Sequence, residues 1–129
     1  MDLQSMKILL VDDAKNMRII SRNLLRQIGF ANIEEATDGE MALLKLRESK
    51  YSLVISDTDL GSGISGIELF KQIRADRQLK SLAFILIVDT EFSKRDFLAA
   101  GDTGPSSYIG RPFNADSLKS KIVSVLGEF

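Results

Sequence analysis

The chain has 129 residues, of which 44% are hydrophobic and 27% charged, and its formal net charge is −1. This length suits one domain with its own core, so we expect a single domain over residues 1–129. The absence of Cys and His excludes a disulfide framework, a thiol nucleophile and an imidazole proton shuttle. A near-neutral charge without a long basic run argues against nucleic-acid binding. The longest apolar run, Phe84 to Val88, is too short to cross a bilayer, which predicts a cytoplasmic protein without membrane contact.

Short apolar runs and helical patterns alternate five times along the chain. This alternation predicts a parallel sheet covered by helices on both faces, a three-layer α/β sandwich. The expected strands are 7–11, 32–36, 53–56, 84–88 and 107–110. The expected helices are 15–28, one from a capping box at Thr37 to about Ser49, one from a capping box at Ser65, 93 to about 101, and one after Asn114 with an inward stripe ending at Leu126.

Charged residues follow four of the expected strands. Asp12 and Asp13 follow the first, Asp57 the third, Asp89 the fourth and Arg111 the fifth. Ligands of an open parallel sheet bind outside the carboxyl ends of its strands, so we expect one site there. The Asp pair alone fits a solvated turn in which one carboxylate caps the next helix. The third acid at another strand end favours a site for a hard divalent cation such as Mg²⁺.

Asp57 also has the chemistry of a nucleophile. A carboxylate can attack phosphorus and form an aspartyl phosphate. Metal-assisted phosphoryl transfer needs a nucleophile, a cation on the phosphoryl oxygens and further positive or hydrogen-bonding groups. Asp57, the Asp12–Asp13 pair with Mg²⁺, and Arg111 can fill these roles.

Three blocks of the sequence, residues 8–13, 54–57 and 111–113, resemble the signature blocks of the response-regulator receiver family. The resemblance covers essentially the whole chain, in order. Details such as Asn16-Met17-Arg18 and residues 33–39 look most like the single-domain chemotaxis receiver. The resemblance implies a doubly wound, five-stranded parallel sheet of the flavodoxin-like type, with strand order 2-1-3-4-5.

The resemblance also implies a role for each matched residue. Asp57 would accept a phosphoryl group from a phosphohistidine on a partner histidine kinase or phosphotransfer protein. Asp12, Asp13 and Asp57 would bind Mg²⁺, with the backbone carbonyl of Asp59 completing the metal site. The protein would be a two-component signalling module rather than an enzyme with turnover.

The output of such a module would be a protein contact. The resemblance places it on the face made by the fourth helix, the fifth strand and the fifth helix, around Tyr108 and Lys94. Without the resemblance, Tyr108 would be interpreted as an edge-strand aromatic that is half buried for packing.

Two site positions depart from the family pattern. Asp89 stands where receivers carry Ser or Thr, and Arg111 where they carry Lys; Gly61 replaces a common Pro in a loop one residue longer. At ~4 Å and an effective dielectric near ~20, a like charge costs at most about 4 kcal/mol. Thr90 offers a hydroxyl, but strand side chains alternate faces, which argues against rescue. Our hypothesis is that the guanidinium fork of Arg111 bridges Asp57 and Asp89.

Other functions remain open from the sequence. A pseudo-receiver would keep the fold and partner face without phosphorylation. Asp57-Thr58-Asp59 has the D-x-D form of haloacid-dehalogenase phosphatases, although that motif belongs after the first strand. A flavin carrier has the same layers, but Asp12-Asp13 would repel the flavin phosphate. We expect Mg²⁺ binding to persist, because four nearby carboxylates attract a cation more strongly than three.

Overall fold

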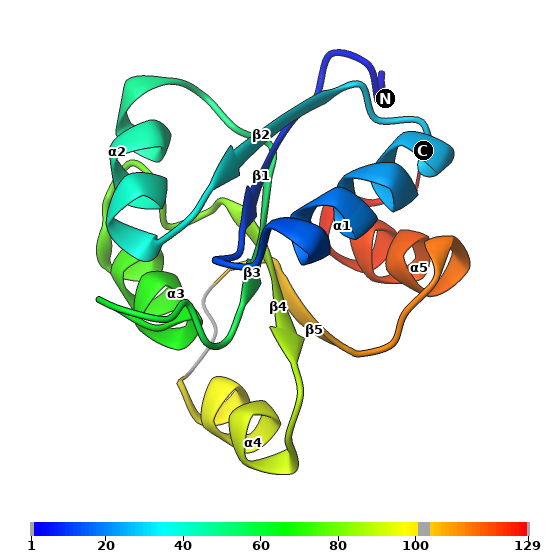
Figure 1. The fold of residues 1–129 in the computed structure, drawn as a ribbon. Coiled ribbons are helices and arrows are strands. Elements are labelled where there is room, and N and C mark those ends of the chain that lie inside the picture. The colour runs from blue at the N-terminus through cyan, green and yellow to red at the C-terminus, as the bar shows by residue number, and fades with distance from the viewer. Residues whose placement is uncertain (1, 101–103, 129) are drawn as a thin grey trace.

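The computed structural model describes residues 2–100 and 104–128, and in it five parallel strands form one sheet in the order β2-β1-β3-β4-β5 (Figure 1). The predicted three-layer, doubly wound architecture is therefore confirmed. The strands are β1 (Lys7–Val11), β2 (Asn32–Ala36), β3 (Leu53–Asp57), β4 (Ala83–Val88) and β5 (Ser106–Gly110). The helices are α1 (Lys15–Ile28), α2 (Gly39–Glu48), α3 (Gly66–Ala75), α4 (Glu91–Ala99) and α5 (Ala115–Leu126).

The sheet is buried on both faces, with a separate hydrophobic cluster on each. Successive strand side chains point to opposite faces, so β1 sends Ile8 and Leu10 into the cluster that includes residues of α1 and α5. Leu9 and Val11 enter the other cluster, with residues of α2 and α3. Figure 1 shows α1 and α5 on one side of the sheet and α2 and α3 on the other. Continuous apolar strands such as β4, buried along its whole length, are typical of this arrangement.

The capping residues of α2 and α3 fix where these helices begin. Asp38, not Thr37, caps α2 by accepting a hydrogen bond from the Met41 backbone N–H at 2.8 Å, so the predicted capping box is wrong by one residue. The carboxylate of Glu40 is used instead to accept from the Ile64 backbone N–H at 3.2 Å. Ser65 caps α3, as predicted, by accepting from the Glu68 backbone N–H at 3.1 Å.

The last elements begin close to their predicted positions. α4 starts two residues earlier than predicted, because Thr90 caps it with a side chain that accepts from the Ser93 backbone N–H at 3.0 Å. Its predicted end at residue 101 lies outside the described residues. Asn114 caps α5 as predicted, with a 2.8 Å bond from the Ser117 backbone N–H. Among the described residues no helix is long and apolar enough to span a membrane.

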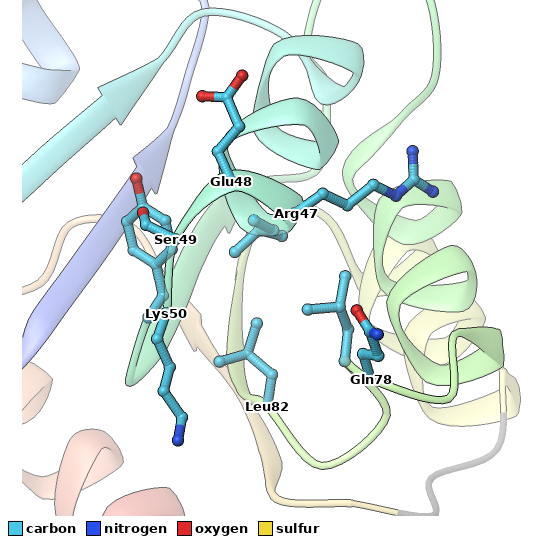
Figure 2. A pocket seen from close by; sticks show the side chains of 9 residues that line it. Arg47, Glu48, Ser49, Lys50, Gln78 and Leu82 are labelled. Carbon is cyan, nitrogen blue, oxygen red and sulfur yellow. The ribbon is translucent and has the colours of Figure 1, made fainter.

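A hollow of about 370 Å³ lies where the chain enters β3 and β4, the opposite end of the sheet from the charged residues (Figure 2). Leu46, Leu79 and Leu82 give it apolar walls, whereas Arg47 and Lys50 bring charge. It therefore does not belong to the charged site at the carboxyl ends of the strands.

Candidate functional site

Three carboxylates meet at the ends of β1 and β3. Strand pairing sets Val11 beside Ser56, which brings Asp12 next to Asp57. Asp12, Asp13 and Asp57 each offer an oxygen within 4.8 Å of the others. Asp12 and Asp57 are buried, whereas Asp13 is exposed. Such a group of oxygen ligands, open on one side, fits a hard divalent cation that keeps some of its water.

Arg111 reaches this cluster from the end of β5. Its Nη2 donates to Asp12 Oδ2 at 3.0 Å and its Nη1 to Asp57 Oδ1 at 3.2 Å. The hypothesis of a bridge between Asp57 and Asp89 is therefore wrong in its second acid, because Arg111 bridges Asp57 and Asp12. The physical reason is burial: a desolvated carboxylate gains more from a guanidinium than an exposed one does, and Asp89 is exposed.

The guanidinium does not neutralise the two buried acids completely. Burial raises the pKa of Asp57 above its usual range, against the opposing charge of Arg111, and the neighbouring charge of Asp12 adds to the rise. Burial likewise raises the pKa of Asp12, although the Ala14 backbone N–H and Arg111 oppose it. Burial thus disfavours the charged forms of both acids, and a hard cation such as Mg²⁺, which prefers carboxylate oxygens as ligands, would favour them.

One oxygen of Asp57 is held and the other is not. Oδ1 accepts from the Thr58 backbone N–H at 2.8 Å and from Arg111 Nη1. Among the described residues none donates to Oδ2. Thr58 is itself fixed, since its hydroxyl donates to the Ile87 carbonyl at 2.7 Å and its carbonyl accepts from the Gly66 N–H at 2.8 Å. Hydrogen bonds of Thr58 thus hold the backbone next to Asp57 in place.

Arg111 is not fully satisfied by these contacts. Its Nε is buried, and none of the described residues accepts a hydrogen bond from it. A buried donor without a partner costs about 1–3 kcal/mol. The peptide bond from Arg111 to Pro112 is cis.

Asp89 lies beside Arg111 but makes no ion pair with any described residue. The two line a hollow of about 320 Å³ together with Thr90, Glu91 and Lys94. The Thr90 hydroxyl is used within the first turn of α4, where it also donates to Ser93 Oγ at 3.1 Å. Thr90 thus acts as a helix cap, in keeping with the argument against its replacing the missing Ser or Thr.

The loop after Asp57 is shaped by its own side chains. Asp59 is exposed, and its Oδ1 accepts from the Gly61 N–H at 2.9 Å, which closes a tight turn. Gly61 has φ +79°, a conformation that Pro cannot adopt because its ring fixes φ near −65°. This geometry explains the Gly at a position where Pro is common. It also holds the Asp59 carboxylate in the turn rather than against Asp57.

A group of three charged residues behind Asp12 was not predicted from the sequence: Arg18, Arg22 and Glu35. Arg18 on α1 donates from Nη1 to the Asp12 carbonyl at 2.7 Å and from Nε to Glu35 Oε1 at 2.7 Å. Arg22 forms a second ion pair with Glu35. Burial works against ionisation of Glu35, but the two guanidinium hydrogen bonds lower its pKa overall. The four-residue spacing of the arginines, which puts both on one helix face, was the available signal.

The predicted partner face is organised around Tyr108, which is half buried on β5. Lys94 Nζ lies 5.2 Å from the centre of its ring and Lys121 Nζ lies 4.8 Å away. A small hollow of about 180 Å³ beside the ring includes Phe97 and Leu98 in its lining. Lys121 was missed in the sequence, because nothing in the pattern of α5 links it to Tyr108.

The family model of the response regulator receiver domain matches residues 8–123. The chain belongs to the response regulator receiver family. It is 42% identical over 119 residues to chemotaxis protein CheY-3 of Vibrio cholerae, covering 92% of this chain and 90% of that protein. It is 40% identical to chemotaxis protein CheY of Pseudomonas aeruginosa, covering 93% and 95% of the two chains.

The fold comparison agrees with this assignment. The structure of chemotaxis protein CheY4 of V. cholerae superimposes with a TM-score of 0.78 at 28% identity, covering 94% of this chain and 98% of that one. The chain is thus the receiver domain of a CheY-like response regulator, a two-component signalling module rather than a conventional enzyme. Receiver domains bind Mg²⁺ at an acidic pocket and interact with histidine kinases and downstream targets.

Proposed function

We propose that Asp57 is the phosphoacceptor of this receiver, in a single cytoplasmic domain that takes its phosphoryl group from a histidine kinase or phosphotransfer protein. The observation that carries the proposal is the asymmetry of the Asp57 carboxylate, with Oδ1 held by two donors and Oδ2 without one among the described residues. Oδ2 attacks phosphorus, a new P–O bond forms, and the bond from phosphorus to the donor's imidazole nitrogen breaks, leaving the electron pair on that nitrogen.

The residues around Asp57 would hold the metal and position the phosphoryl group. Asp12, Asp13 and Asp57 would supply carboxylate oxygens for Mg²⁺, and the backbone carbonyl of Asp59 would complete the set. Bound there, Mg²⁺ would neutralise charge on the phosphoryl oxygens. Arg111 supplies the positive charge on the side of β5, where its fork offers two donors instead of the single ammonium of Lys.

The output of the domain is a contact on the face formed by α4, β5 and α5. Tyr108 lies on this face, and the Nζ atoms of Lys94 and Lys121 lie near its ring. Phosphorylation at the end of β3 would bias the neighbouring ends of β4 and β5, which carry Asp89 and Arg111. A downstream protein that binds better to one arrangement of this face would then read the phosphorylation state.

Acetyl phosphate with Mg²⁺ tests the chemistry directly. Intact-mass measurement is expected to show the gain of one phosphoryl group on the wild-type protein and none on Asp57→Asn. The matched control is Asp59→Asn, which keeps the acceptor and changes a carboxylate that lies in the turn. Hydrogen–deuterium exchange on the phosphorylated protein is then expected to change in 83–99 and 106–122, the segments of the output face.

A phosphorylation-independent pseudo-receiver is the second candidate, favoured by one observation. Arg111 already bridges Asp12 and Asp57 without any phosphoryl group, so the site is partly neutralised at rest. In that case the wild-type protein gains no mass from acetyl phosphate or from a phosphorylated histidine kinase, yet still binds its partner through the Tyr108 face. A mass gain that persists in Asp57→Asn would contradict both candidates.

A further inference from the structure

We propose that Asp89 is a positioning residue for Arg111: it is the second acceptor, to which the guanidinium turns when a divalent cation takes its place at Asp12 and Asp57. The inference rests on the proposed metal site and adds a second position for Arg111. It assigns a role to the acid that makes no ion pair with the described residues.

The first step is that Arg111 and the cation compete for the same oxygens. Arg111 donates to Asp12 Oδ2 and Asp57 Oδ1 at 3.0 and 3.2 Å, and both acids belong to the group whose oxygens lie within 4.8 Å of one another. A cation among these oxygens would lie within a few ångströms of the guanidinium, where two positive charges repel. Metal binding therefore weakens at least one of the two Arg111 contacts.

The second step is that the strand register places an acceptor within reach. β4 and β5 pair Val88 with Gly110, so Asp89 and Arg111 leave adjacent strands at the same level. Adjacent strands lie about 4.8 Å apart, and an Arg side chain is longer than that. Both residues line the 320 Å³ hollow, which gives the guanidinium room to turn.

The third step concerns the contacts that Asp89 and the Arg111 guanidinium lack. Asp89 is exposed and makes no ion pair with the described residues, so its carboxylate is available. Arg111 Nε is buried without an acceptor in its present position. A turn toward the hollow would expose Nε to water or to Asp89, which offsets part of the cost of leaving Asp12 and Asp57.

The hollow contains a second acid that serves as an internal control. Glu91 lies in the first turn of α4 and lines the same space. It lies two residues after Asp89 and belongs to the helix, whereas Asp89 directly follows β4. Glu91→Gln removes the same charge as Asp89→Asn and reports the effect of charge alone.

Calorimetric titration of metal-free protein with MgCl₂, without a phosphoryl donor, tests the inference. Arg111→Gln removes the competitor and is expected to lower the Mg²⁺ Kd about tenfold, the scale of one charge-assisted hydrogen bond. Asp89→Asn is expected to raise the Kd about threefold to fivefold when Arg111 is present and to change it less than about twofold in Arg111→Gln. Asp89→Glu, which restores the carboxylate, is expected to return the Kd toward the wild-type value.

The outcomes separate the two proposals. If Asp89→Asn raises the Kd by the same factor with and without Arg111, or if Glu91→Gln has the same Arg111-dependent effect, Asp89 acts only as a distant charge and the inference is overturned. If Arg111→Gln leaves the Kd unchanged, there is no competition and the inference is also overturned, while the metal site stands. If neither the wild type nor Arg111→Gln binds Mg²⁺, the metal site itself is wrong. Far-UV circular dichroism and a cooperative urea transition confirm that each variant is folded.

Discussion

The ends of β1 and β3 differ from the ends of β4 and β5 in how firmly their charged residues are held. Asp12 and Asp57 are buried and hydrogen-bonded by backbone N–H groups, and Arg18 supports the backbone behind Asp12. At the other pair, Asp89 is exposed, and Arg111 reaches across to acids that belong to β1 and β3. The carboxylates of the first pair are thus held in fixed positions, whereas the charged side chains of the second pair border a hollow of about 320 Å³.

The largest expected effect comes from adding one methyl group near the end of β3 and, for comparison, one at the end of β5. A Cβ on Gly66 would lie 2.0 Å from the Asp57 carbonyl oxygen, a contact with backbone that cannot move away without moving Asp57 itself. We expect Gly66→Ala to lower the free energy of unfolding by about 3 kcal/mol or more, at the upper end of the range for overpacking.

The matched variant is Gly110→Ala at the end of β5. Its Cβ would come no closer than 3.9 Å to the Val88 carbonyl oxygen, so we expect stability within about 1 kcal/mol of the wild type. Urea denaturation followed by circular dichroism measures both. Equal losses in the two variants would show that the β3 end is not the tighter of the two.

Removing one negative charge from each region should change the free energy of unfolding less, and at Asp57 it should increase it. Burial raises the pKa of Asp57, so its ionised form opposes folding in the metal-free protein. We expect Asp57→Asn to raise the free energy of unfolding by about 1 kcal/mol at pH 7.5 in a chelating buffer, a typical size for one substitution. Asp89→Asn, at an exposed acid, should change it by less than about 0.5 kcal/mol.

The pH dependence of the Asp57 effect has a definite sign. A raised pKa in the folded state means that the penalty is absent below the ordinary pKa of Asp, 3.8, where the carboxyl is protonated in both states. The penalty grows as the pH rises through the folded-state pKa. The gain from Asp57→Asn should therefore shrink toward zero as the pH falls to about 4, measured by urea denaturation across the series. A gain that grows at low pH would contradict the raised pKa.

The sequence predicts which charged residues lie together at the strand ends, but it does not predict how they pair. Asp12, Asp57 and Arg111 follow apolar strands, and parallel strand ends necessarily meet, so their grouping is readable from position alone. The acids that Arg111 contacts cannot be predicted from position, because the choice between Asp12 and Asp89 depends on which carboxylate is desolvated. The cap of α2 was misplaced by one residue for a related reason: Thr37 and Asp38 are both good caps, and the sequence does not show that Glu40 is used by Ile64.

The support behind Asp12 gives the next prediction. Hydrogen bonds from Arg18 and Arg22 lower the pKa of Glu35, although burial opposes this, so ionised Glu35 favours the folded state. This contribution is present above the unfolded pKa and is lost as the pH falls through the folded-state pKa. We expect Glu35→Gln to cost about 1 kcal/mol at pH 7, since Glu35 is one-third exposed, and little near pH 3.

Glu34→Gln is the control for this measurement. Glu34 is 43% exposed and lies 3.6 Å from Lys45, a surface ion pair worth about 0–1 kcal/mol. Chemical denaturation at the two pH values compares them. A loss for Glu35→Gln that is the same at both values would mean that packing, not charge, explains the effect.

The smallest expected effect lies on the predicted partner face, where two lysines lie near the ring of Tyr108. Lys121 Nζ lies 4.8 Å from the centre of the half-buried Tyr108 ring and Lys94 Nζ lies 5.2 Å away, cation–π contacts worth about 0.5 kcal/mol each. Lys121→Met should therefore lower stability by about 0.5 kcal/mol, and should have no effect in a Tyr108→Leu background. Urea denaturation of the double-mutant cycle measures this coupling. A coupling above about 1.5 kcal/mol would show that α5 is firmly tied to β5, and that the side of the molecule assigned to signalling is as rigid as the side assigned to chemistry.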